Sequence, residues 1–173
     1  MEQLIAGGYN IINLDQYPPK IRSHEKFWEK VNLLDENEVN RLVINFLPSH
    51  VVHLAARTDL NGQNMDDYAV NTKGTKNLMN ALNQHSRPEH VLFASSMLVC
   101  RPGYIPAHDL DFSATTMYGK SKVRMEEIIR AAVVLAAEPP ADRINWSFET
   151  KGGWLYPDID KWETYYGRDE TWH

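Results

Sequence analysis

The chain has 173 residues, of which 43% are hydrophobic, and this length and composition suit one globular domain. Acidic residues outnumber basic ones by 23 to 18, which argues against a general nucleic-acid-binding protein. The single cysteine, Cys100, excludes an internal disulfide framework, and with neither a signal peptide nor a long apolar span we expect a cytoplasmic protein without a membrane partner.

Short apolar runs alternate with longer helical patterns along the chain. This alternation is typical of βα units and a parallel sheet, so the sequence predicts an α/β fold. The predicted strands cover residues 10–14, 29–33, 50–55, 91–95 and 144–148, and the predicted helices cover residues 37–46, 65–84 and 116–137.

The composition changes after Pro139 and Pro140. Four of the five tryptophans and three of the eight tyrosines lie in the last 28 residues, which show no clear period. We therefore expect residues 1–148 to form the folded domain and residues 149–173 to form an irregular, aromatic-rich tail whose rings serve packing or an interface.

A tyrosine and a lysine, Tyr118 and Lys122, are spaced to share one face of the last predicted helix. A cation held there favours loss of the phenol proton. The apolar run at residues 91–94 ends in Ser95 and Ser96, which places a hydroxyl at the carboxyl end of a strand. Together these residues form a candidate proton-transfer site, although the tyrosine–lysine spacing alone also fits a solvated helix face.

No metal site is predicted. His50 and His53 lie three apart on a predicted strand, so their side chains point to opposite faces. The spacing of the other histidines and of Cys100 suggests no further ligand set, and Cys100 fits a small buried hydrophobic residue.

Several landmarks follow one another in the order found in a known family. Residues 8–15 (GYNIINLD) end in Asp15, and residues 51–56 (VVHLAA) form a second apolar run. Residues 71–77 (NTKGTKN) come next, followed by the serine pair and by Tyr118 with Lys122. With these motifs, residues 2–136 resemble the extended short-chain dehydrogenases/reductases of the NAD-dependent epimerase/dehydratase family, and in particular the nucleotide-sugar epimerases.

The resemblance implies a Rossmann-like doubly wound parallel sheet that binds NAD. Asp15 would accept the adenosine ribose hydroxyls, which favours NAD over NADP, although it could also be an ordinary turn carboxylate. The other cofactor-binding residues implied are Asn32, Leu33, Leu54, Ala55, Ala56, Asn71, Tyr118 and Lys122. Asp35, near the adenine side, could equally cap a helix, and Asn71 could serve the structure instead.

The resemblance also implies a mechanism. Tyr118 would take a proton from a sugar hydroxyl during hydride transfer, Lys122 would assist it and bind the nicotinamide ribose, and Ser96 would hydrogen-bond to the reacting oxygen. Family dehydratases carry acidic residues just after this serine, whereas Met97 and Leu98 stand here. An NAD-dependent epimerase or related oxidoreductase acting on a nucleotide sugar is therefore expected.

The chain departs from the family pattern at both ends. The opening strand and its Gly-x-x-Gly-x-x-Gly turn are not found; residues 1–6 resemble the helix that follows that turn, with Gly7 and Gly8 as its stop. Without this central strand the sheet would be incomplete, with two unpaired strand edges inside it. At the other end, residues 149–153 replace an Arg-Pro turn, and the substrate domain is largely missing.

Two kinds of protein fit these observations. One is the epimerase, whole or truncated, and the other is a non-catalytic binding or interaction protein that keeps the dinucleotide fold. Because this family often pairs through two helices, we also expect a homodimer through residues 65–84 and 116–137.

Overall fold

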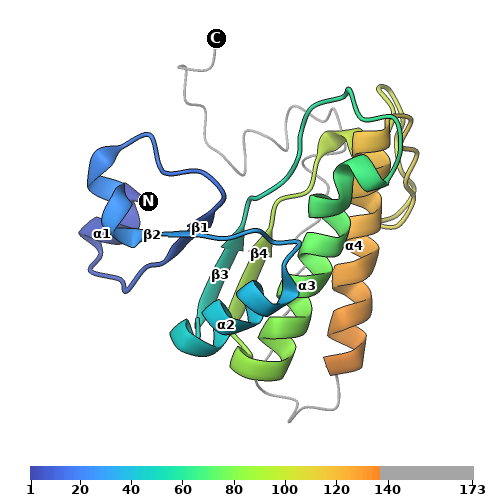
Figure 1. The fold of residues 1–173 in the computed structure, drawn as a ribbon. Helices are drawn as coiled ribbons and strands as arrows, with labels where there is room; N and C mark the ends of the chain where they lie inside the picture. The colour runs from blue at the N-terminus through green and yellow to red at the C-terminus, as the bar shows by residue number, and fades with distance from the viewer. Residues whose placement is uncertain (137–173) are drawn as a thin grey trace.

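The computed structural model describes residues 1–136, so the predicted strand at 144–148 and the aromatic tail lie outside the described residues. Figure 1 shows the arrangement of the elements. In chain order they are α1 (Glu2–Ala6), β1 (Asn13–Asp15), β2 (Trp28–Lys30), α2 (Glu36–Phe46), β3 (His50–His53), α3 (Thr75–Ala81), β4 (His90–Phe93) and α4 (Met117–Ala136). None of the helices described is both long and apolar enough to cross a membrane.

The strands form two parallel pairs. β1 pairs with β2 from Asn13 opposite Trp28, and β3 pairs with β4 from His50 opposite His90. Over the residues described, β1 and β3 each have one neighbouring strand only. The predicted α/β fold with an incomplete parallel sheet is therefore confirmed, including the two edges that lack a partner in this part of the chain.

Both strand pairs contribute to one hydrophobic core, together with α2 and α3. Its buried members are Val31, Leu33, Val39, Leu42, Val43, Leu78, Ala81 and Leu82. Partly buried residues of the strands, including Leu14 and Phe93, pack against them. Each fully buried aliphatic side chain of this kind contributes about 1.5–3 kcal/mol, so this core holds the two pairs in one domain.

The observed strands are shorter than the predicted ones or shifted. β1 begins three residues later than predicted, β2 stops at Lys30 instead of residue 33, and β3 and β4 each stop two residues early. A strand extends only where a neighbour can accept its hydrogen bonds, and apolar pattern does not reveal where that pairing stops. As a consequence Leu54, Ala55 and Ser95 lie just beyond strand ends.

The predicted helix at 65–84 is present as successive helical segments over 66–86, but only part of this stretch is a regular α-helix. A 3₁₀ segment (η2, Asp66–Tyr68) and a π-helical segment (η3, Val70–Gly74) precede α3, and a second π-helical segment (η4, Leu82–Ser86) follows it. At the η3 junction Thr75 Oγ1 donates a 2.9 Å hydrogen bond to the Asn71 carbonyl. A side chain that bonds to the helix backbone in this way competes with the regular ladder, which fits the widened turn.

The predicted glycine stop of the first helix is confirmed, and of the two roles left open for Asp35 the structure shows the helix cap. Asp35 caps α2, because its carboxylate accepts a 3.1 Å hydrogen bond from the Glu38 amide. Gly7 and Gly8 end α1, with Gly8 at a positive φ of 72° that favours glycine. The predicted helices at 37–46 and 116–137 agree with α2 and α4 to within one residue at each end.

Candidate functional site

The turn after β4 packs directly against the first turn of α4. A Cβ atom built on Gly119 would lie 2.1 Å from the Leu98 carbonyl oxygen, so only glycine allows this approach. The Leu98 amide donates a 3.2 Å hydrogen bond to Ser96 Oγ. Through this bond Ser96 caps the short 3₁₀ helix η5 (Met97–Val99). The predicted serine therefore lies in the turn that contacts the helix segment carrying Tyr118.

Tyr118 is nearly buried, with 9% of its surface exposed, at the start of α4. Its ring lies 6.2 Å from the ring of Tyr68, at an interplanar angle of 50°. Tyr68 is fully buried, and its hydroxyl donates a 2.7 Å hydrogen bond to the Asp59 carbonyl. The ring of Tyr118 thus lies beside a buried tyrosine ring that a hydrogen bond holds in place.

Lys122 lies one helical turn further along α4 and is only 3% exposed. Its Nζ donates a 2.6 Å hydrogen bond to the Ala94 carbonyl and contacts Met125 Sδ at 3.1 Å. Burial lowers the pKa of Lys122 to about 8, although the carboxylate of Glu126 acts in the opposite direction. An ammonium has three donors, and two of them have an acceptor among the described residues.

His53, at the end of β3, lies near this lysine. The side chain is 6% exposed and packs edge-on against Phe93, with ring centroids 5.1 Å apart. Burial, followed by the charge of Lys122, lowers the pKa of His53 to about 4, so the ring is neutral at pH 7. His50 is exposed, which confirms that the two histidines point to opposite sides. Within residues 1–136 no cluster of three acidic, histidine or cysteine side chains could hold a metal ion.

Two of the residues predicted to bind the cofactor lie at the end of one strand and just beyond the end of its neighbour. Asp15 is exposed at the end of β1, and its carboxylate accepts a 3.0 Å hydrogen bond from the Tyr17 amide. Asn32 lies two residues beyond β2, and its Oδ1 accepts from Gln16 Nε2 at 3.1 Å. Because Gln16 follows Asp15 directly, this bond holds the two polar strand ends side by side.

The apolar residues predicted to contact the cofactor differ in exposure. Leu54 is 67% exposed and Ala55 is exposed, whereas Ala56 is half-buried, and all three follow β3 directly. Leu33, by contrast, belongs to the core, and its carbonyl accepts a 2.9 Å hydrogen bond from Asn77 Nδ2. The Leu33 side chain therefore serves packing.

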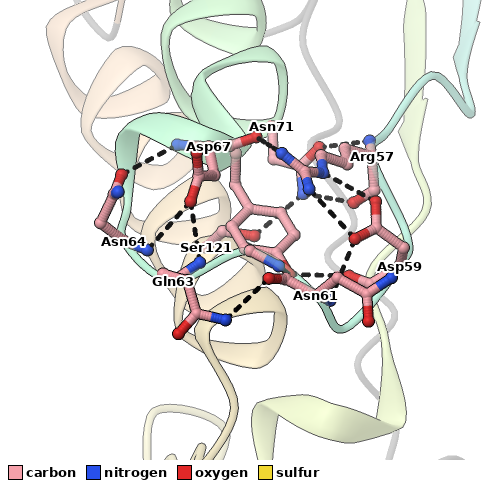
Figure 2. Close-up of polar contacts among 10 residues, drawn as sticks. Arg57, Asp59, Asn61, Gln63, Asn64, Asp67, Asn71 and Ser121 are labelled. Atoms are coloured by element: carbon pink, nitrogen blue, oxygen red, sulfur yellow. Dashed lines mark hydrogen bonds and ion pairs between the residues drawn. The ribbon is translucent and has the colours of Figure 1, made fainter.

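Asn71 joins the loop after β3 to α4, as Figure 2 shows. The side chain is fully buried; Oδ1 accepts from the Arg57 amide at 2.8 Å, and Nδ2 donates to the Arg57 carbonyl at 3.0 Å and to Ser121 Oγ at 2.9 Å. Ser121 Oγ donates in turn to the Tyr118 carbonyl at 2.6 Å. These contacts favour the structural role that the sequence left open for Asn71.

The loop of residues 57–67 is held by its own polar contacts (Figure 2). Arg57 pairs with Asp59 at 2.7 Å, donates to the Asp67 carbonyl at 2.8 Å, and places its guanidinium over the ring of Tyr68. Amide hydrogen bonds from Gln63 and Asn64 lower the pKa of Asp67. No local sequence pattern predicts this network, because its partners become neighbours only after the loop folds back on η2.

A second contact that was not predicted from the sequence joins Ser95 to Glu126. The Ser95 hydroxyl donates to Glu126 Oε1, and the Glu126 carboxylate is 6% exposed. The spacing of Glu126, four residues after Lys122, was the available signal, since it places both side chains on one face of α4.

Comparison with known proteins identifies the family. The model of the NAD dependent epimerase/dehydratase family matches residues 1–135. The chain belongs to this family. Among curated members, the human UDP-glucose 4-epimerase is 31% identical over 110 residues, covering 60% of this chain and 31% of that protein. The bovine UDP-glucose 4-epimerase is 30% identical over 151 residues, covering 74% of this chain and 43% of that protein.

Solved structures of epimerases share the fold. The UDP-glucose 4-epimerase of Thermus thermophilus, crystallised with NAD, superposes with a TM-score of 0.65 at 26% identity. That match covers 78% of this chain and 46% of the Thermus chain. The chain thus spans less than half the length of these epimerase relatives.

Proposed function

We propose that this chain has the chemistry of an NAD-dependent nucleotide-sugar epimerase or a related oxidoreductase, acting in the cytoplasm. One observation carries the proposal: the turn containing Ser96 packs against the α4 segment that bears Tyr118 and Lys122. The similarity to UDP-glucose 4-epimerases supports a nucleotide sugar as the substrate.

The side chains fit the two ends of NAD. At the adenosine end, the exposed carboxylate of Asp15 and the neighbouring Asn32 suit ribose hydroxyls and the adenine side. At the nicotinamide end, the third donor of Lys122 suits the second ribose. Gly7 and Gly8 end α1 and so do not form a turn that would bind the pyrophosphate. We therefore expect the described residues to contact NAD mainly through its two nucleosides.

In the proposed reaction Tyr118 Oη, as phenolate, accepts the proton of a sugar hydroxyl while the hydrogen on the same carbon leaves as hydride. NAD, when bound, supplies the acceptor for that hydride and returns it. Lys122 binds the nicotinamide ribose, and Ser96 Oγ hydrogen-bonds to the reacting oxygen. Tyr118 returns its proton to that oxygen at the end, so that no net oxidation results when the hydride returns to the opposite face.

The experiment is turnover with purified chain, NAD and a panel of UDP-sugars, followed by sugar analysis. Tyr118→Phe keeps the buried ring against Tyr68 and removes the hydroxyl, so we expect turnover to fall by about 100-fold or more. Tyr17→Phe is the matched control, because Tyr17 is 74% exposed. Equal turnover in the wild type and Tyr118→Phe would overturn the role of Tyr118.

A homodimer is part of the proposal. α3 and α4 lie side by side in Figure 1, and Lys76, Arg124 and Glu127 are exposed on them. Two copies of this helix pair could form a four-helix interface in which basic residues of one copy face acidic residues of the other. Sedimentation equilibrium distinguishes a dimer from the 19.9 kDa monomer, and Arg124→Glu should shift the balance toward the monomer if the pair forms this interface.

The alternative is a non-catalytic binding protein with the dinucleotide fold. It is favoured by one observation: the only adjacent glycine pair in the described N-terminal segment, Gly7 and Gly8, caps a helix and does not form a phosphate-binding turn. This alternative predicts weak or absent NAD binding and no turnover with any sugar of the panel.

A further inference from the structure

Glu126 is a buried carboxylate on the face of α4 that bears Lys122. Only 6% of its surface is exposed, although burying a charged group is costly unless it has close partners. Glu126 Oε1 accepts the hydroxyl hydrogen of Ser95, and Oε2 lies 3.7 Å from Arg130 Nη2. The main partner therefore comes from the turn after β4, 31 residues earlier in the chain.

Two charged residues of α4, one helical turn apart, hold two consecutive residues of that turn. Lys122 Nζ binds the Ala94 carbonyl at 2.6 Å, and Glu126 binds the Ser95 hydroxyl. The next residue is Ser96, whose hydroxyl faces the Leu98 amide. This pair of contacts fixes the turn in both position and rotation relative to the helix, which a single contact would not do.

We propose that Glu126 is a positioning residue. It acts through Ser95 to fix the position of Ser96 relative to Tyr118 and Lys122. The inference rests on the proposed function, because it assigns Glu126 to the same Ser96, Tyr118 and Lys122 site. Glu126 does not touch the reacting atoms in this account.

The charge of Glu126 has a second effect, on Lys122. Among the described residues, two ionisable groups interact electrostatically with the ammonium: Glu126 on α4 and His53 at the end of β3. His53 is neutral at pH 7, since its pKa is lowered to about 4. Glu126 therefore supplies the negative charge that opposes the effect of burial on the pKa of Lys122. Its removal should lower that pKa below about 8.

Three variants separate this role from simple packing. Glu126→Gln keeps the size and one acceptor for Ser95 but removes the charge. Ser95→Ala removes the donor, and Ser95→Thr restores a hydroxyl. The matched control is Glu127→Gln, because the neighbouring Glu127 is exposed and pairs only with Arg124 among the contacts described, at 2.7 Å.

The first measurement is the titration of Lys122 in the ligand-free full chain labelled with ¹³C-lysine, followed by NMR and assigned by the loss of its signal in Lys122→Met. Glu126→Gln should lower the midpoint of Lys122 by roughly one pH unit. Glu127→Gln should leave the midpoint unchanged. Equal midpoints in Glu126→Gln and Glu127→Gln would overturn the electrostatic part of the inference, whether or not the chain turns over sugar.

The second measurement is turnover. Ser95→Ala should lower kcat by about 10-fold with KM changed less than twofold, because a misplaced Ser96 weakens the transition state more than substrate binding. Ser95→Thr should recover most of kcat. An unchanged kcat in a folded Ser95→Ala protein would overturn the positioning role. Absence of turnover in the wild type would instead count against the proposed function, while the Lys122 titration would still decide the effect of Glu126.

Discussion

The Lys122 ammonium donates a 2.6 Å hydrogen bond to the carbonyl oxygen of Ala94, across 28 residues of sequence. Ala94 directly follows β4 and precedes the serine pair, so this bond joins the carboxyl end of a strand to α4. Lys122 thereby contributes both a structural contact and a buried positive charge one helical turn after Tyr118.

The buried charge of Lys122 should appear in the pH dependence of stability. Its pKa is about 8 in the folded chain and 10.5 without burial, so the unfolded chain binds more protons between these values. The free energy of unfolding should therefore rise with pH from about 8 to 10.5, by at most about 3 kcal/mol from this group. Urea unfolding of Lys122→Met should lack this rise, and Lys120→Met, at an exposed position, should retain it.

His53 should make the fold sensitive to acid. Its pKa is lowered from 6.5 to about 4 by burial, so below pH 6.5 the unfolded chain takes up a proton that the folded chain resists. Stability should fall as the pH drops from 6.5 to 4, by up to about 3 kcal/mol. In His53→Gln this part of the loss should disappear, while His50→Gln, on the exposed side of the same strand, should behave as the wild type.

Gly119→Ala tests the close approach of α4 to the turn after β4. The added methyl group would lie 2.1 Å from the Leu98 carbonyl oxygen, so helix and turn must separate. We expect a loss of about 1–3 kcal/mol in unfolding free energy by urea titration, together with reduced turnover, because Ser96 would move away from Tyr118. Lys120→Ala is the control; a Gly119→Ala protein as stable as that control would contradict the packing described.

Asn71→Ala tests the anchor of the loop at residues 57–67. The substitution leaves the Arg57 backbone groups and Ser121 without their amide partner, so we expect a loss of roughly 2–4 kcal/mol and faster proteolysis within the loop. Asn61→Ala removes an exposed amide from the same loop and should change neither. Mass spectrometry of the first cleavage site provides the measurement.

Much of the fold was predictable from local patterns. The apolar periodicity of α4 and the alternation of apolar runs with helices each arise from neighbours in sequence, and the family motifs indicated a sheet without its central strand. Strand ends were less predictable because pairing depends on the neighbouring strand. The π-helical turns beside α3 depend on the side chains of Asn71 and Thr75, whose bonds no hydrophobic pattern reveals.

The sequence could predict only part of the arrangement of the proposed site residues. The placement of Tyr118 and Lys122 on one face of α4 follows from helix geometry alone. That Lys122 would point toward Ala94, and that Glu126 would reach Ser95, depends on how closely the β4 turn approaches Gly119. Such contacts join residues about 30 positions apart, so only the folded chain specifies them.

The central proposal is that Asp15, Asn32 and Lys122 bind NAD. Calorimetric titration of NAD at pH 7 tests it most directly. We predict a dissociation constant on the order of micromolar for the wild type. Lys122→Met should weaken binding about tenfold through the loss of one charge-assisted hydrogen bond, whereas Lys120→Met should bind as the wild type does. Binding heats that are absent in the wild type, or identical in the wild type and Lys122→Met, would contradict the account.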